Sequence, residues 1–181
     1  MSRARPRLTV ARVVGGATAL AVPGFAATAA FAPADEGFSV GRFAVALALF
    51  VLAATPLVAT RRGGNKRLYG WRETAFLVCL PFVPTTSLLL AMTVSALLAG
   101  VARRQSALKL VFNTALVVVD GAVAIAIVTP THLLRPTVNW ALLLRFPDLL
   151  LVVAATAAMA LVSALGTAIV VATVGPRRCV G

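Results

Sequence analysis

Long apolar runs separated by short polar segments are the dominant pattern along this chain. The runs occupy residues 13–32, 43–60, 74–102, 108–128 and 149–174. An apolar stretch of about 20 residues is long enough to cross a bilayer as a helix. The pattern therefore predicts an all-α fold, a polytopic transmembrane helix bundle in which residues 1–181 form a single integral membrane domain.

The third and longest run contains a pair of prolines, Pro81 and Pro84. Proline lacks the backbone N–H donor and clashes with the preceding helical turn, so one straight helix is a poor description of this run. We expect the helix to break at residues 81–84 and the chain to fold back as a helical hairpin. The bundle then has four full crossings plus this hairpin, and five ordinary crossings are the alternative.

The charge distribution favours the hairpin. The chain is 60% hydrophobic and carries 17 Lys+Arg against 5 Asp+Glu, with the basic residues in short segments between the apolar runs. Short cytoplasmic loops of membrane proteins collect Lys and Arg. With a cytoplasmic N-terminus, the hairpin leaves only Arg42, Arg135 and Arg145 on the outer side. The predicted cytoplasmic basic loops contain Arg61, Arg62, Lys66, Arg67, Arg103, Arg104 and Lys109.

These features predict a multi-pass protein of the inner (plasma) membrane. The first run follows four arginines and ends in small residues before Pro33, which also fits a signal peptide cleaved after Ala32. Its length exceeds the usual apolar core of a signal peptide, so we favour an uncleaved first helix. A nucleic-acid partner is not expected, because no basic helix with interleaved aromatic residues is present.

Two polar residues lie deep in the fourth run. Asp120 falls near the middle of the bilayer, where a carboxylate costs about 2.5–3.5 kcal/mol on insertion scales. We expect it to face protein in its neutral form. Asn113 lies seven residues earlier, on nearly the same helix face. The two residues predict either a polar site for a ligand or an interhelical hydrogen bond that serves packing.

Other chemistry is scarce. The sequence shows no catalytic constellation, no metal-ligand spacing and no motif for a cofactor, so we predict no enzyme activity, no metal and no cofactor. In the last run, small residues recur every four positions and predict close packing against another helix of the chain. They are Thr156, Ala160, Ala164 and Ala168.

The segments WRETAFLVCLPFVPTTSLLLAMTVSALLAG (residues 71–100) and RRQSALKLVFNTALVVVDGAVAIAI (residues 103–127) carry a composite motif. An acidic residue opens the first segment, a proline break and an Arg-Arg loop follow, and K-x-x-F-N precedes a second acidic residue. The motif resembles the N-terminal membrane region of actinobacterial cyclic-di-GMP signalling proteins with GGDEF, EAL or HD-type domains. No such catalytic domain is present in this sequence. The matching positions are Glu73, Lys109, Phe112, Asn113 and Asp120.

The resemblance implies a membrane module that senses a ligand or membrane state, or anchors a signalling complex, without catalysis of its own. Asn113 and Asp120 would form its polar site, and Glu73 would fix the start of the broken helix. Its partners would be the lipid bilayer and either a second copy of the chain or a cytoplasmic signalling protein. The alternatives are a small transport or substrate-capture subunit, since a broken helix facing a buried carboxylate also describes transporter sites, and a truncated orphan fragment.

Overall fold

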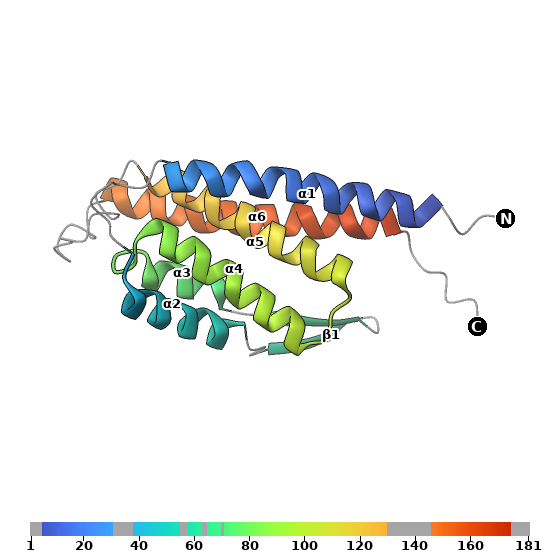
Figure 1. Cartoon of the computed structure of the whole chain (residues 1–181), viewed down its shortest axis with the longest axis horizontal. Coiled ribbons are helices and arrows are strands. Elements are labelled where there is room, and N and C mark those ends of the chain that lie inside the picture. The colour runs from blue at the N-terminus through green and yellow to red at the C-terminus, as the bar shows by residue number, and fades with distance from the viewer. Residues whose placement is uncertain are drawn as a thin grey trace.

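The chain folds into a helix bundle with one small β-hairpin (Figure 1). The structure is a computed structural model, and it describes residues 5–30, 38–54, 58–62, 65–69, 71–129 and 146–174. The predicted all-α bundle is confirmed, and the hairpin is an addition that the apolar pattern does not predict. The elements are α1 (Arg5–Ala30), α2 (Val40–Ala53), β1 (Val58–Arg62), β2 (Asn65–Tyr69), α3 (Arg72–Cys79), α4 (Thr85–Ala102), α5 (Ala107–Val128) and α6 (Phe146–Val174).

Four of these helices contain segments that are long and apolar enough to cross a membrane. The chain is therefore a multi-pass membrane protein. Large apolar side chains such as Leu20, Val101 and Leu161 are exposed on these helices, which suits a surface that faces lipid. The four segments are Ala11–Ala30, Thr85–Ala102, Ala107–Val128 and Leu149–Val170.

The helices form two layers, which meet where α4 packs on α5. Figure 1 shows α1, α5 and α6 side by side in one layer and α2, α3 and α4 in the other. Glycines allow the neighbours of α5 to come close. A Cβ on Gly121 would lie 2.7 Å from Leu89 of α4, and a Cβ on Gly166 of α6 would lie 2.7 Å from Leu116 of α5. Real Cβ atoms are not found so close to other heavy atoms, so the glycines permit α4 and α6 to pack closely against α5 at these positions.

The second apolar run forms a shorter helix than its pattern predicts. We expected a helix through residue 60, but α2 has 14 residues and ends at Ala53, and Val58–Arg62 form β1. Pro56 disfavours helical backbone at the residue before it. The β-branched Val58 and Thr60 then favour a strand. A high content of apolar residues does not by itself continue a helix.

The third run is broken at the predicted position. The N–H groups of Phe82 and Val83 both donate to the carbonyl oxygen of Cys79 at 3.0 Å, which ends α3, and Pro84 has extended backbone before α4 begins. The two arms are unequal, with 8 residues in α3 and 18 in α4. They differ because the proline pair lies near the start of the run rather than at its middle.

The two ends of this broken hairpin return to the same end of the bundle. The Trp71 N–H, just before α3, donates to the carbonyl oxygen of Ala53 at 3.1 Å. The guanidinium of Arg103, just after α4, donates to the carbonyl oxygen of Ala54. Both contacts satisfy carbonyl groups that the end of α2 leaves without an intrahelical donor. The start of α3 and the end of α4 are therefore neighbours.

The predicted small-residue stripe of the last helix does not face the bundle. Ala160, Ala164 and Ala168 are exposed, whereas Ala155 and Met159 are fully buried. The expectation of packing within the chain is wrong for this stripe. A spacing of four residues marks a row on a helix surface, but the neighbouring helices decide which row turns inward.

Candidate functional site

The candidate site is centred on Asp120 in α5. By the rise of an α-helix, this residue lies about 20 Å from the Ala107 end of the helix and about 12 Å from the Val128 end. Its side chain is 0% exposed. The adjacent Gly121 allows α4 to pack directly beside it. Asp120 is therefore a carboxyl group enclosed by protein in the interior of a membrane bundle.

Two other helices supply polar partners to this carboxylate. Arg72, the first residue of α3, donates from Nη2 to Asp120 Oδ2 at 2.8 Å. Ser163 of α6 donates from Oγ to the same oxygen at 2.6 Å and accepts from Arg72 Nη2 at 3.0 Å. The three side chains thus form a closed triangle that joins α3, α5 and α6. We call it the Arg72–Asp120–Ser163 cluster.

We expected a neutral Asp120 that faces protein, and the structure surrounds it with protein side chains and supplies Arg72 as a counter-charge. The guanidinium of Arg72, whose side chain is 28% exposed, balances the carboxylate, so Asp120 does not have to be neutral to be buried. The sequence pattern assigns Arg72 to a basic loop, because it follows several cations and precedes the apolar run. In the structure its side chain reaches inward instead.

Part of the hydrogen-bonding capacity of the cluster is unused. Within the part of the chain that the structure describes, Asp120 Oδ1 and Arg72 Nε are buried and have no hydrogen-bond partner. Glu73, the next residue of α3, lies close enough to Asp120 for their charges to interact. Buried polar atoms are usually paired, so these unpaired atoms distinguish the cluster from an ordinary packing contact.

Asn113 is not part of this cluster. Its Nδ2 donates to Oε1 of Gln105 at 2.9 Å, and both side chains are half-buried. Gln105 lies in the turn between α4 and α5. The structure therefore separates Asn113 and Asp120, which share a helix face, into two sites with different partners. Asn113 ties the turn to α5, and this local bond is neither a polar site shared with Asp120 nor the interhelical hydrogen bond of the packing interpretation.

The turn that carries Gln105 is tightly constrained. Its N–H donates to the carbonyl oxygen of Gly100 at 3.0 Å, and the Arg104 N–H donates to that of Val101 at 2.9 Å. These two bonds form a Schellman motif at the end of α4. Arg104 has a φ of 49°, the left-handed conformation that glycine usually adopts there.

The prolines lie away from the cluster. Pro81 and Pro84 form the turn between α3 and α4, at the far end of α3 from Arg72. The helix terminus that lies beside the buried Asp120 carboxylate is therefore the start of α3. The proline break lies at the other end of α3. Glu73 lies in the first turn of α3, where a carboxylate interacts favourably with the helix dipole.

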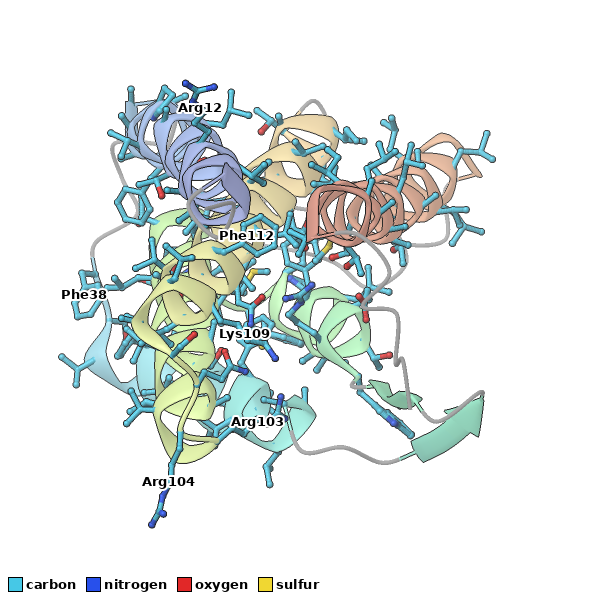
Figure 2. The ribbon with its side chains drawn as sticks, turned by 90° about the vertical axis from the view of Figure 1, so that its right-hand side faces the viewer. Arg12, Phe38, Arg103, Arg104, Lys109 and Phe112 are labelled. Carbon is cyan, nitrogen blue, oxygen red and sulfur yellow. The ribbon has the colours of Figure 1, made fainter. Side chains whose placement is uncertain are left out.

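The predicted basic loops lie together at one end of the bundle. Figure 2, which looks onto the end where α1 begins and α6 ends, shows Arg103, Arg104 and Lys109 on the facing side, with Arg104 pointing away from the ribbon. All three are exposed. The hairpin extends from the same end and carries Arg61 and Arg62 in β1 and Lys66 and Arg67 in β2.

A comparison with protein-family models finds no match to this chain, and comparisons with curated proteins and with solved structures find no significant one. The resemblance to cyclic-di-GMP signalling proteins therefore stays a prediction from the motif alone.

The sequence interpretation identified Asp120, Asn113 and Glu73 but missed Arg72, Ser163 and Gln105. The residues that complete the cluster lie 48 and 43 positions from Asp120, so no local spacing connects them. A weak signal existed for Arg72, which directly adjoins the apolar run. Ser163 gave none, because serine is common in membrane helices.

Proposed function

We propose that this protein is a non-catalytic module of the bacterial inner membrane that senses membrane state, or anchors a signalling complex, through the Arg72–Asp120–Ser163 cluster. The observation that carries the proposal is an ion pair between α3 and α5 that Ser163 of α6 completes, inside a membrane bundle. Ionisable residues at such positions are costly and by default mark function. A bundle held together by apolar packing alone needs no such pair.

The position of α3 suits a switch. This helix has 8 residues, its first residue holds the ion pair, and it follows the β-hairpin after residues 70 and 71. A helix so short is not stable by itself and depends on its contacts. Movement of the hairpin or of α2 would therefore bear directly on Arg72. The two states would be Arg72 paired with Asp120 and Arg72 released.

We propose membrane thickness as the physical input of this switch. The 14 residues of α2 extend about 21 Å, and the 22 residues of α5 extend about 33 Å, against about 30 Å of hydrocarbon. A change in bilayer thickness places unequal mismatch on the two layers of the bundle. The layer that contains the short helix α2 also contains α3, whose first residue is Arg72.

We place the N-terminus and the basic end in the cytoplasm. Support comes from the meeting of the start of α3 and the end of α4, which puts both basic segments beside the start of α1. A topology reporter fused at Gln105 tests this orientation. A cytoplasmic signal is expected, and a periplasmic signal would contradict it.

Distance measurements between spin labels test the sensing role. Labels at Val78 of α3 and Leu165 of α6, both exposed, report on α3, and labels at Leu97 of α4 and Val111 of α5 serve as a reference pair. The native cysteines are replaced by Cys79→Ala and Cys179→Ser. In nanodiscs of short-chain and long-chain phosphatidylcholine, we expect the α3–α6 distance to change with thickness and the reference distance to stay constant.

Two variants identify the cluster as the coupling point. Asp120→Asn is expected to broaden the α3–α6 distances and abolish their dependence on thickness. Asn113→Ala, which removes a polar group from the same helix face, is the matched control and should behave as the wild type. If Asp120→Asn also behaves as the wild type, the cluster is a static packing feature and the sensing role is wrong.

A transport subunit is the second candidate, because the short helix α3 begins at the buried carboxylate. Half-helix ends facing an ionisable group are typical of transporter sites. The proton is the simplest probe for such an activity. If the protein transports protons, the interior of proteoliposomes that contain a pH-sensitive dye should acidify under an inward proton gradient. Asp120→Asn should abolish this proton flux. A flux no larger than that of protein-free liposomes would leave sensing as the better description.

A further inference from the structure

The two layers of the bundle differ in the length of their outermost helices. In one layer, α1 contains an apolar segment of 20 residues and α6 contains one of 22 residues. These segments extend about 30 Å and about 33 Å, which matches a hydrocarbon thickness of about 30 Å. In the other layer, α2 has 14 residues and extends about 21 Å. Figure 1 shows α2 ending well short of the level at which α1 begins and α6 ends.

The apolar surface that α2 presents to lipid is shorter than the helix itself. Ala46 and Phe50 are buried in the core, whereas Val45 and Leu52 are exposed on the outer side of the helix. Arg42, the third residue of α2, is also exposed. A guanidinium at the edge of a membrane helix keeps its charged end at the level of the lipid headgroups. Arg42 therefore marks one boundary of the lipid-facing surface.

The other boundary lies where α2 ends. The N–H of Trp71, a residue that is 56% exposed, donates to the carbonyl oxygen of Ala53 at 3.1 Å. The guanidinium of Arg103 donates to the carbonyl oxygen of Ala54. Tryptophan and arginine both favour the headgroup level. The helix between Arg42 and Ala54 extends about 17 Å, little more than half of the hydrocarbon thickness.

A helix that is too short for the bilayer has few ways to relieve the mismatch. Tilting would shorten its span further, and snorkelling of Arg42 adds no more than the length of one side chain. The helix cannot slide along the membrane normal by itself, because Trp71 and Arg103 hold its end beside α3 and α4. Thinning of the adjacent bilayer is the remaining response of the lipid.

We propose that the outer face of α2 is an interaction surface for phospholipids with short acyl chains, which form a locally thinned bilayer on this side of the bundle. On the other side, α1 and α6 contact lipids of ordinary length (Figure 1). The proposal requires that the bundle lies in a membrane. It does not require that the Arg72–Asp120–Ser163 cluster senses anything, so either idea can fail without the other.

Fluorescence quenching by brominated phosphatidylcholines tests this surface. Val45→Trp places a reporter on α2 and Leu161→Trp places one on α6, at positions that are both 60% exposed. Trp71→Tyr and Trp140→Phe remove the native tryptophans, and the tyrosine keeps a ring that favours the interface. Each reporter is measured in mixtures of short-chain dimyristoleoyl and long-chain dierucoyl phosphatidylcholine, with one or the other lipid brominated.

The α2 reporter should favour the short-chain lipid by about threefold, because every ångström of mismatch adds a modest cost. The α6 reporter should show no preference for the short-chain lipid. Equal preferences at the two positions would overturn the proposal. An α2 reporter that neither brominated lipid quenches would also overturn it, because a protein surface such as a second copy of the chain would then cover α2.

The variant Arg42→Leu tests the boundary of the surface. It extends the apolar surface toward Val40 and keeps the backbone N–H of residue 42, which donates to Ser39 Oγ at 3.5 Å. The short-chain preference at α2 should fall by about half. Arg12→Leu, which removes an exposed arginine from α1, is the matched control and should keep the full preference. An unchanged preference in Arg42→Leu, or an equal fall in both variants, would show that the proposed surface is wrong.

Discussion

Asn113 and Asp120 lie on one face of the same helix, yet they differ in burial and in where their hydrogen-bond partners come from. Asn113 bonds to Gln105, eight residues away in the adjoining turn, and both side chains remain half-buried. Asp120 is fully buried and bonds to residues of two other helices, more than 40 positions away. A polar residue near a helix end can be satisfied locally, whereas an ionisable residue at depth must recruit partners from the tertiary fold.

The largest effect on stability should follow when the ion pair between Arg72 and Asp120 is broken. Asp120→Ala leaves Arg72 without its counter-charge, and Arg72→Ala leaves a buried carboxylate alone; each should lower the free energy of unfolding by about 3–5 kcal/mol. Unfolding in mixed detergent micelles measures this loss. The double variant Arg72→Met/Asp120→Leu should be at least as stable as the wild type, and a double variant as unstable as the single ones would contradict the pairing.

A smaller loss is expected for Ser163→Ala. The Ser163 hydroxyl donates to the charged Asp120 at 2.6 Å, and a hydrogen bond to a charged group is worth about 1.5–3 kcal/mol. Ser87→Ala is the matched control, because Ser87 Oγ in α4 is buried with no hydrogen-bond partner among the described residues. The same unfolding measurement should show little change or a gain for Ser87→Ala. Equal losses in both variants would argue against the bond to Asp120.

A glycine at position 104, in the turn beside Asn113, should stabilise the protein. Arg104→Gly relieves a left-handed residue and should raise the free energy of unfolding by about 1 kcal/mol. Arg104→Ala removes the same charge but keeps the Cβ, so it should give no gain. The difference between the two variants in thermal unfolding isolates the backbone effect, and identical stabilities would show that the turn is not strained.

The smallest effect is expected for Asn113→Ala, a loss of about 0.5–1 kcal/mol, because water can hydrate the half-buried Gln105 that it leaves behind. A double-mutant cycle with Gln105→Ala measures the coupling between the two amides. A loss as large as that of Asp120→Ala would show that Asn113 and Asp120 form one site after all.

Much of the fold is readable from the order of residues. Apolar runs of spanning length predict the membrane helices, and Pro81 and Pro84 predict the break, because these effects act over a few neighbouring residues. The clustering of cations predicts that the start of α3 and the end of α4 lie together. The boundary of α2 was missed, since its apolar run continues past Pro56 into β-branched residues that favour a strand.

The sequence by itself determined the membrane class, the helix break and the position of Asp120 inside a long apolar helix, because hydropathy and proline chemistry are local properties of the chain. Only the tertiary structure decided that Arg72 turns inward, that Ser163 completes the cluster and that Arg61 stands opposite Lys66. These pairings join segments from different helices or opposite strands. Packing and register create them, and neither is encoded in the spacing of any single run.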